Sequence, residues 1–251
     1  MTGGMTGGMT GALAVVLAYL IGGIPFGLII VKLMTGADVR EAGSGNIGAT
    51  NVLRTTGLAA GVVTLVLDAA KAWIAVWLAD RLSGGSEFWM SFAALAALLG
   101  HAWPVWLRFR GGKAVASFVG AYAYLTPAPL LAVVLLFVFV VAWTRYLSLG
   151  SIIAAGLFPV ACWMIIHPGW PVLLSALGAA IVIVGRHRGN IARIRAGSRR
   201  LQPVARCRGG GHSQSVAAEA VVGPGTACSS RQSPFEPANA APGGPARCQG
   251  S

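Results

Sequence analysis

Charged side chains are scarce in this sequence. They make up 10% of the 251 residues, and 55% of the residues are hydrophobic. Soluble domains carry roughly 25% charged residues, so a chain of this composition cannot cover a globular surface with polar groups. The composition excludes an ordinary cytosolic enzyme and indicates a protein of the lipid bilayer.

Cysteine and acidic residues are also few. The four cysteines, Cys162, Cys207, Cys228 and Cys248, show no CxxC spacing, so neither a zinc site nor a disulfide framework is predicted. Only 7 Asp and Glu stand against 19 Lys and Arg, which gives a formal net charge of +12. In a membrane protein this excess belongs in short connections and tails, where it sets topology and attracts anionic lipids or substrates. Binding of nucleic acid explains the positive charge less well than these roles at a membrane.

Long uncharged runs predict membrane-spanning helices. Residues 13–31 form the first, with about the length that crosses a ~30 Å hydrocarbon core. Further spans are predicted at 57–79, 88–107, 152–166 and 170–185. Residues 114–144 are ambiguous, because this run is either one tilted helix or two short helices that turn at Thr126-Pro127-Ala128-Pro129.

The placement of basic residues favours the hairpin. With two helices in residues 114–144, one side of the membrane receives Arg40, Arg54, Arg108, Arg110, Lys113, Arg145 and the basic segment after Gly185. Only Arg81 then lies on the opposite side, which is the positive-inside pattern. We therefore expect an all-α integral membrane protein with seven transmembrane helices, the N-terminus outside and the C-terminus cytoplasmic.

The two ends of the chain differ from its apolar middle. Residues 1–11 repeat the unit MTGG and lack the basic region of a cleaved signal, so we expect a flexible leader. Residues 202–251 are rich in Gly and Pro and have almost no apolar run. Such a segment cannot bury enough surface to offset the entropy of ordering, which predicts a disordered low-complexity tail. Residues 12–201 remain as the transmembrane domain.

Two connections on the predicted cytoplasmic side carry candidate anion-binding chemistry. Residues 40–54 read REAGSGNIGATNVLR; glycines, hydroxyls and carboxamides between two arginines suit a backbone nest around a phosphate. The alternative is a Gly-rich turn capped by Ser and Asn. Residues 100–117 read GHAWPVWLRFRGGKAVAS and place Gly-Gly-Lys at a helix start, where an anion is favoured. The basic residues there could instead act only as topology signals.

The second connection is not a nucleotide-binding loop. Leu107 stands where a Walker A loop has its first Gly, and Ala114 replaces the Ser or Thr that would hold magnesium. A third polar segment, residues 185–198, reads GRHRGNIARIRAGS and could be only a basic helix at the membrane edge.

Asp68 and Lys71 are charged residues inside the second predicted span. They are three positions apart and share a helical face, where an ion pair limits the penalty of burying either charge. The pair is either structural, fixing helix packing, or a neighbour of a substrate.

In this order, the three polar segments resemble those of the bacterial membrane glycerol-3-phosphate acyltransferases that use acyl phosphate as donor. The similarity covers about residues 12–200. The first motif matches throughout. The second resembles a GGKGVAT pattern but has Ala114 and Ser117, and the third resembles HRENI and AGTE patterns but has Gly189 for Glu and Ser198-Arg199 for Thr-Glu.

The resemblance implies an activity and a set of site residues. The activity is transfer of a fatty acyl group from acyl phosphate to the 1-hydroxyl of glycerol 3-phosphate, giving lysophosphatidic acid and phosphate in the first step of phospholipid synthesis, with no cofactor or metal. The implied catalytic residues are Ser44, Lys113, His187 and Asn190. The implied substrate-binding residues are Gly45, Asn46, Thr50, Asn51, Arg54, His101, Gly111, Gly112 and Ser117. Membrane lipids and an acyl-phosphate-producing enzyme are the implied partners, and the site faces the cytoplasm at the bacterial inner membrane.

These residue types fit the implied reaction. Arg54 and Lys113 would neutralise phosphate charge, and phosphate is already a good leaving group, so preorganised donors would carry most of the rate. His101 or His187 could act as a base. No histidine is followed five positions later by Asp, which excludes the mechanism of soluble-headed acyltransferases that use thioesters.

Two other classes of protein stay open. Basic loops at membrane edges could form the gate of a transporter for an anionic phosphorylated metabolite, or the chain could be a lipid-binding scaffold without chemistry. Transporters usually show paired broken helices in two related halves, and no internal repeat is visible here, which favours the enzyme.

Overall fold

The structure, a computed structural model, describes residues 3–195. The chain divides into two units, Met1–Ala205 and Arg206–Ser251, and every element described below belongs to the first. The tail predicted over residues 202–251 lies outside the described residues.

The described residues form helices joined by short connections, which confirms the predicted all-α class. The helices are α1 (Gly3–Gly22), α2 (Phe26–Thr35), α3 (Ala49–Thr55), α4 (Leu58–Ser83), α5 (Glu87–Ala102), α6 (Val115–Leu125), α7 (Pro127–Thr144), α8 (Leu147–Ile166), α9 (Trp170–Arg186) and α10 (Arg188–Arg195). Single 3-10 turns occur at Val39–Glu41 and Val105–Leu107. Within the described residues, five segments are long and apolar enough to cross a membrane, namely Gly8–Thr35, Leu58–Ser83, Glu87–Leu107, Pro127–Thr144 and Leu147–Ile166, and α6 and α9 are shorter apolar helices.

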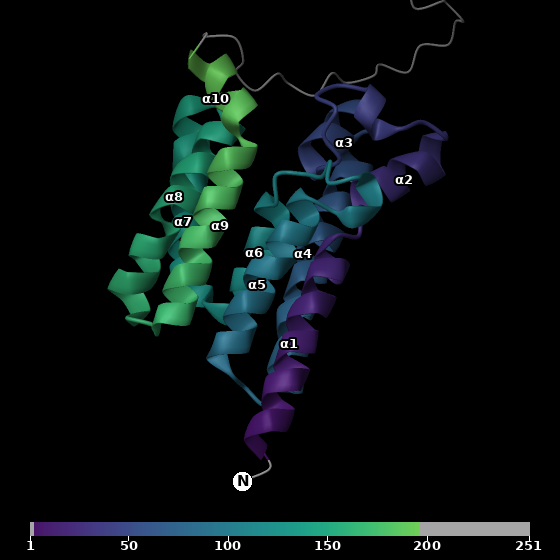
Figure 1. Cartoon of the computed structure of the whole chain (residues 1–251). Helices are drawn as coiled ribbons and strands as arrows, with labels where there is room; N and C mark the ends of the chain where they lie inside the picture. The colour runs from purple at the N-terminus through teal and green to yellow at the C-terminus, as the bar shows by residue number, and fades with distance from the viewer. Residues whose placement is uncertain (1–2, 196–251) are drawn as a thin grey trace, which may run out of the picture. The chain divides into compact units, whose positions relative to one another are not determined.

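The first apolar run is divided into two helices. Helix α1 ends at Gly22 and α2 begins at Phe26, and Figure 1 shows α2 bending away from the direction of α1. Pro25 lies in the break and has no N–H to donate, which interrupts the helical hydrogen-bond ladder. The span predicted over residues 13–31 therefore contains a bend, and the bend directs the following connection across the end of the helices.

Helix α1 extends back to Gly3, through most of the segment 1–11 that the sequence predicts to be a flexible leader. Gly11 lies so close to the indole ring of Trp89 on α5 that a Cβ atom there would lie 2.4 Å from the ring. Packing against α5 thus supports a helix in a glycine-rich stretch whose intrinsic helix propensity is low.

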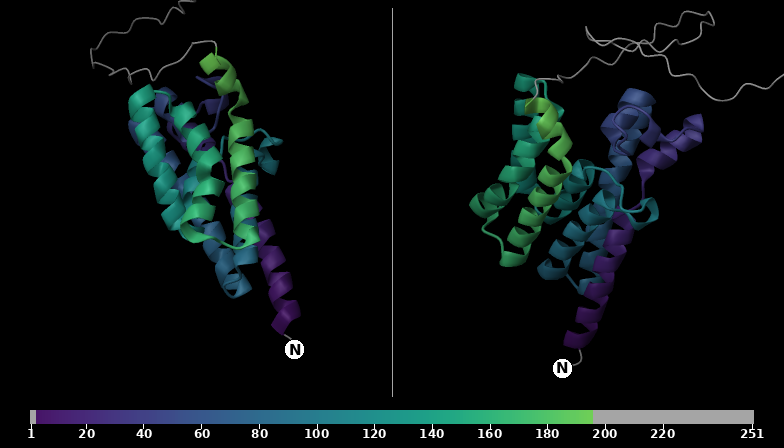
Figure 2. Two further views of the ribbon diagram at one scale, coloured as in Figure 1. Left: turned by 90° about the vertical axis from the view of Figure 1, so that its left-hand side faces the viewer. Right: turned by 45° about the horizontal axis from the view of Figure 1, so that its top comes forward.

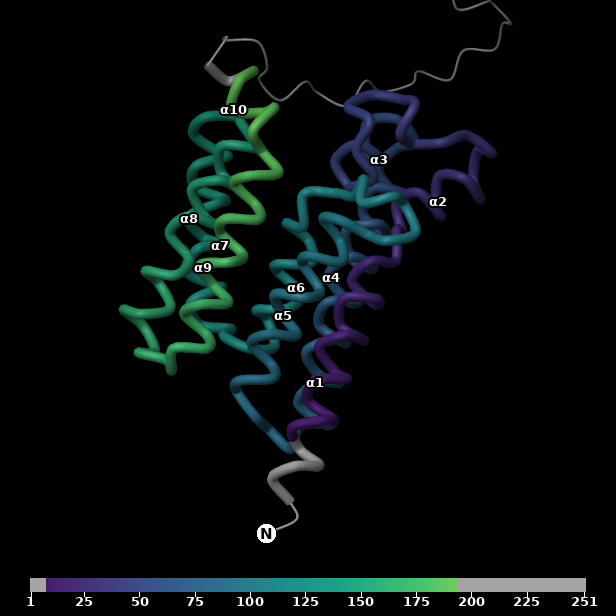
Figure 3. The backbone as a smooth tube through the Cα atoms, in the orientation of Figure 1, coloured from purple at the N-terminus to yellow at the C-terminus, as the bar shows by residue number. Residues whose placement is uncertain are grey.

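Residues 114–144 form two helices, as the charge pattern predicts. Helix α6 ends at Leu125 and α7 begins at Pro127, where a missing N–H costs nothing. Figure 3 shows the chain reversing between them. Helix α6 packs on α4, whereas α7 packs on α8, so the hairpin links two groups of helices.

The helices form two groups that meet at α5 and α9. Helices α1, α4, α5 and α6 pack together, and α7, α8 and α9 form the second group (Figure 2). The buried side chains of α4 and α5 are mainly alanines: Ala72, Ala75, Ala79, Ala93, Ala94 and Ala97. Small residues let helix backbones approach closely, which is how helices associate in a bilayer.

The polar connections gather at one end of this unit. Figure 1 places residues 36–57, residues 103–114 and α10 at the upper end, which we call the polar end, and places the start of α1 and the α4–α5 turn at the opposite end. The fold therefore brings the three motif segments to one end of the unit, although they are up to about 150 positions apart in the sequence.

Candidate active site

The first motif is a loop built around Asn51. The Asn51 side chain is 2% exposed. Its Oδ1 accepts hydrogen bonds from the N–H and Oγ of Ser44, at 2.8 and 3.1 Å, and its Nδ2 donates to the carbonyls of Val39 and Ala42, at 3.1 Å each. Both ends of the carboxamide are thus used inside the loop. Asn51 places Ser44 at the pocket described below and does not itself line that pocket.

An ion pair orients the arginine that precedes this loop. Arg40 donates from Nε to both Asp38 oxygens at 3.0 Å and from a terminal nitrogen at 2.5 Å. The Arg40 hydrogen bonds lower the pKa of the Asp38 carboxyl to about 2, so the pair stays ionised near neutral pH.

Within the first motif, Asn46 Oδ1 accepts a hydrogen bond from the N–H of Gly48 at 2.9 Å. This local turn fixes the Asn46 side chain.

The Gly-Gly of the second motif is clamped between α5 and α9. The N–H groups of Gly111 and Gly112 donate to the carbonyls of Ala102 and His101, at 3.2 and 3.0 Å. From the other side, Arg186 donates to the carbonyls of Gly111 and Gly112, at 2.6 and 2.9 Å. A Cβ atom at Gly112 would lie 2.1 Å from His101 Nε2, so only glycine fits. These N–H groups hold the loop on α5, and Lys113 follows directly.

Lys113 meets the third motif. Its Nζ donates to Asn190 Oδ1 at 2.8 Å, and Arg193 donates to the same oxygen at 2.9 Å. Asn190 Nδ2 donates in turn to Ser148 Oγ on α8. Asn190 therefore connects α10 to the second motif and to α8.

Positive charge accumulates around Lys113. Burial, together with the neighbouring charges of Arg193, Arg54 and Arg186, lowers the pKa of Lys113 to about 8. Cations held this close repel one another, and the repulsion is relieved when an anion binds between them. The cluster of Lys113 and these arginines is hereafter called the Lys113 cluster.

His187 lies near enough to Lys113 for the charge of that lysine to lower the pKa of the imidazole. Its side chain is 2% exposed, and its Nδ1 lies 2.8 Å from the Ile183 carbonyl, which can only accept, so Nδ1 carries the proton. Burial lowers the pKa of His187 to about 4. The imidazole is therefore neutral near pH 7, with Nε2 unprotonated.

Four more predicted site residues lie apart from the pocket lining. His101 and Ser117 are buried; Ser117 Oγ donates to the Asp68 carbonyl at 3.2 Å and joins α6 to α4. Thr50 and Arg54 lie exposed on α3.

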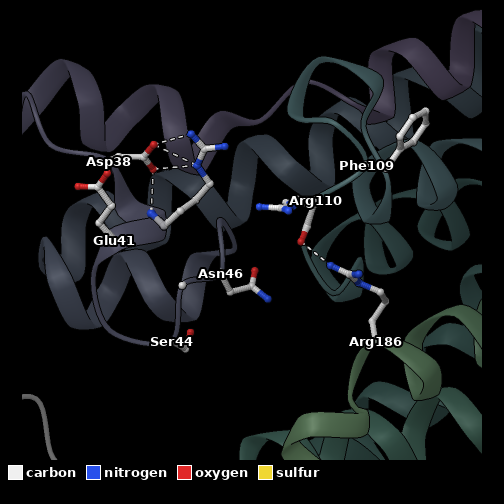
Figure 4. A pocket seen from close by; sticks show the side chains of 10 residues that line it. Asp38, Glu41, Ser44, Asn46, Phe109, Arg110 and Arg186 are labelled. Atoms are coloured by element: carbon white, nitrogen blue, oxygen red, sulfur yellow. Dashed lines mark hydrogen bonds and ion pairs between the residues drawn. The ribbon is translucent and has the colours of Figure 1, made fainter.

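A cavity of about 600 Å³ lies at the polar end among the three motif segments (Figure 4). Its lining residues are Asp38, Arg40, Glu41, Ser44, Gly45, Asn46, Phe109, Arg110, Gly111 and Arg186. Of the residues implied by the motifs, Ser44, Gly45, Asn46 and Gly111 come together here. One side of the pocket is cationic, with Arg110 and Arg186, and the other carries the carboxylates of Asp38 and Glu41 (Figure 4).

The two cationic pocket residues were missed as site residues by the sequence analysis. There, Arg110 and the basic segment that contains Arg186 serve to set the orientation of the chain in the membrane. The signal that marks them is adjacency, because Arg110 directly precedes Gly-Gly-Lys and Arg186 directly precedes His187. Arg186 also stacks over Trp103, with its guanidinium carbon 5.5 Å from the ring centroid, so it is held in place from two sides.

The chain is similar to known acyltransferases. The family model for glycerol-3-phosphate acyltransferase matches residues 12–197. The chain is 45% identical over 179 residues to a glycerol-3-phosphate acyltransferase of Anaeromyxobacter dehalogenans, covering 70% of this chain and 89% of the relative. It is 46% identical over 180 residues to one of Roseobacter denitrificans, covering 72% and 88%.

Two solved structures share the fold. Both are crystal structures of PlsY (YgiH), an integral membrane glycerol 3-phosphate acyltransferase. Its glycerol 3-phosphate form aligns with a TM-score of 0.72 and 38% identity, over 76% of this chain and 96% of that chain. Its lysophosphatidic acid form aligns with a TM-score of 0.69 and 36% identity, over 76% and 95%.

The resemblance drawn from the three motifs is thereby confirmed. The matched region contains the first two motif segments, residues 185–197 of the third, and every described helix from α2 to α10. The chain belongs to the glycerol-3-phosphate acyltransferase family of integral membrane enzymes.

Proposed function

We propose that this acyltransferase moves a fatty acyl group from acyl phosphate to the 1-hydroxyl of glycerol 3-phosphate, with release of phosphate and lysophosphatidic acid. The observation that carries the proposal is a pair of adjoining cationic sites. Arg110 and Arg186 line the pocket, and the charge of Arg186 also lowers the pKa of Lys113. Two adjoining cationic sites suit a reaction in which both substrates carry a phosphate.

The pocket suits the acceptor. A phosphate binds the guanidinium groups of Arg110 and Arg186. Across the pocket, the Glu41 carboxylate and the Ser44 oxygen, whose own proton is donated to Asn51, accept hydrogen bonds from glycerol hydroxyls. An anion at one end and hydroxyls at the other is the pattern of glycerol 3-phosphate. The single hydroxyl of Ser44, fixed by Asn51, helps to orient the acceptor.

The Lys113 cluster suits the donor phosphate. Lys113 and Arg54 neutralise its charge and Asn190 fixes the ammonium, so the acyl carbonyl is held where the 1-hydroxyl can attack. A carbon–oxygen bond forms to the 1-hydroxyl, and the bond from the carbonyl carbon to the phosphate oxygen breaks. The hydroxyl proton passes to the released phosphate, which is basic near neutral pH, so buried His187 need not reach the hydroxyl and instead supports the cluster as a neutral group.

We also propose a membrane arrangement for the enzyme. Helices α1, α4, α5, α6, α7, α8 and α9 cross the membrane, with the N-terminus outside and the polar end in the cytoplasm of a bacterial cell, at the inner membrane. The support is the positive-inside rule, since Arg54, Arg110 and Lys113 lie in polar-end segments and Arg81 lies near the opposite end of α4. The acyl chain then lies among the helices, and an acyl-phosphate-producing enzyme delivers the donor from the cytoplasmic side.

The choice of acyl donor provides a test of the proposed function. Purified protein in detergent is expected to acylate glycerol 3-phosphate from acyl phosphate and not from acyl-CoA, since the pocket and the Lys113 cluster each accommodate a phosphate rather than an adenine nucleotide. The measurement is lysophosphatidic acid formed from each donor, by mass spectrometry, with chain length matched. Equal or greater product from acyl-CoA would overturn the choice of donor.

The activity is expected to fall on the alkaline side because of Lys113. Its pKa is lowered to about 8, so the ammonium that attracts phosphate is present below this pH and is lost as the pH rises through it. The ratio kcat/KM, which reports the free enzyme, should therefore decline between pH 7 and 9. In Lys113→Arg the guanidinium stays charged, and the decline should vanish or move to higher pH. An identical alkaline decline in that variant would assign the titration to another group.

A further inference from the structure

Three buried polar side chains link α4 and α5 beneath the polar end. Asp68 and Lys71 on α4 are each 3% exposed at the side chain, and His101 on α5 is 4% exposed. None of them lines the pocket. Burying charge among apolar helices is unfavourable, so an ion pair at this depth needs a reason beyond its own attraction.

The Lys71 ammonium forms hydrogen bonds to three different parts of the chain. It donates to Asp68 Oδ1 at 2.7 Å, to the Ile24 carbonyl at 2.6 Å and to His101 Nδ1 at 3.1 Å. An ammonium has three donors and no acceptor, so His101 Nδ1 accepts and the imidazole proton is on Nε2. A pair that only stabilised α4 would need the first of these bonds alone.

The bond to Ile24 fixes the break between α1 and α2. The Ile24 carbonyl lies beside Pro25, where the helical ladder is interrupted, and Lys71 Nζ lies 5.7 Å from the ring centroid of Phe26, the first residue of α2. Helix α2 leads into residues 36–48, which carry the acidic side of the pocket and Ser44. Lys71 therefore sets where this wall of the pocket begins.

The bond to His101 fixes the opposite wall. The His101 carbonyl accepts the Gly112 N–H at 3.0 Å, and the ring edge at Nε2 fills the space that a Cβ atom at Gly112 would need. Gly111 lines the pocket, and Lys113 follows Gly112. In addition, Trp106 donates from Nε1 to the Gly23 carbonyl at 2.8 Å, so the α5–α6 connection and the α1–α2 break are joined a second time.

We propose that Asp68, Lys71 and His101 form a positioning network that holds the two walls of the glycerol 3-phosphate pocket in register. The network touches no substrate. Its ammonium spans the α1–α2 break and the Gly111–Lys113 loop, so losing it lets the cationic and acidic sides of the pocket separate and weakens binding of the acceptor. The inference rests on the proposed function for the identity of the acceptor.

Two substitutions of similar size at His101 separate positioning from packing. His101→Asn keeps an acceptor near the position of Nδ1, whereas His101→Leu removes it and leaves one donor of Lys71 unsatisfied. We expect the KM for glycerol 3-phosphate to rise by about 10-fold or more in the Leu variant and to stay within about 3-fold of wild type in the Asn variant. An equal KM in both variants would overturn the proposal.

The double variant Asp68→Asn with Lys71→Met tests the charges themselves. It removes both buried charges at nearly constant volume, which leaves no isolated ion and protects folding. Its KM for glycerol 3-phosphate should rise at least about 10-fold while the midpoint of thermal unfolding in detergent falls little. A KM within about 2-fold of wild type would overturn the proposal.

A matched control is Ser175→Ala, which removes a buried hydrogen-bond relay away from the pocket. Ser175 Oγ contacts Tyr122 Oη at 2.7 Å and donates to the Ser91 carbonyl at 2.8 Å. This variant should lower the unfolding midpoint without changing the KM. Stabilisation of each protein by glycerol 3-phosphate alone supplies a second measure that needs no turnover. A wild-type protein that makes no lysophosphatidic acid refutes the proposed function, whereas an active wild type with unchanged variants refutes the network alone.

Discussion

Replacing Lys113 with Ala is expected to lower turnover by about 10²-fold or more while the protein stays folded in detergent, since a charge-assisted phosphate contact contributes about 1.5–3 kcal/mol and lost orientation adds to it. The substitution removes the cation at the centre of the Lys113 cluster and frees Asn190 from its contact at 2.8 Å. Activity is measured with acyl phosphate and glycerol 3-phosphate, and folding by the unfolding midpoint.

The control for Lys113 is Arg145→Ala, which removes an exposed cation that follows α7 and lies outside the pocket lining. It changes the net charge by the same amount, so it reports any general electrostatic attraction of anionic substrates. Turnover close to wild type is expected there. Equal losses in both variants would show that Lys113 acts only through long-range charge.

Arg186→Ala is expected to cost a similar factor, about 10²-fold in kcat/KM, with much of it in the KM for glycerol 3-phosphate. Arg186 both lines the pocket and holds the carbonyls of Gly111 and Gly112, at 2.6 and 2.9 Å. Its loss removes a phosphate contact and loosens the loop that positions Lys113.

Arg186→Lys separates these two contributions. A lysine keeps the charge but cannot hold two carbonyls with one planar fork, so it should recover only part of the lost activity. Arg188→Ala, an exposed neighbour on α10, should be nearly neutral. Full activity in Arg186→Lys would mean that charge alone matters at this position, and a loss in Arg188→Ala equal to that in Arg186→Ala would remove the assignment to the pocket.

The sequence predicts the helices well where charge and length decide. The α6–α7 hairpin follows from the positive-inside rule, because a single helix over residues 114–144 would place most basic connections on the wrong side. The bend between α1 and α2 is harder to predict, because Gly23 to Pro25 is itself uncharged and apolar residues continue on both sides of it. Hydropathy indicates that a segment lies within the membrane, but it does not indicate the direction in which the helix axis runs.

The site is predictable in composition and less so in geometry. The resemblance identifies Ser44 and Lys113 as polar groups of one site. The sequence does not indicate that both ends of the Asn51 carboxamide form hydrogen bonds within the first loop. From the sequence, the N–H groups of Gly111 and Gly112 could be available to bind an anion. In the fold they donate hydrogen bonds to backbone carbonyls of α5. Which donors remain for a substrate depends on tertiary partners, and spacing along the chain does not reveal them.

The most direct test of the central claim follows the atoms of the reaction. Purified enzyme is given acyl phosphate with a ¹³C carbonyl and glycerol 3-phosphate with ¹⁸O in its 1-hydroxyl, and the products are analysed by mass spectrometry. We expect lysophosphatidic acid that carries both labels in its ester, formed in equal amount with unlabelled phosphate. Phosphate released without this product, or product lacking ¹⁸O in the ester, would contradict attack of the 1-hydroxyl on the acyl carbonyl.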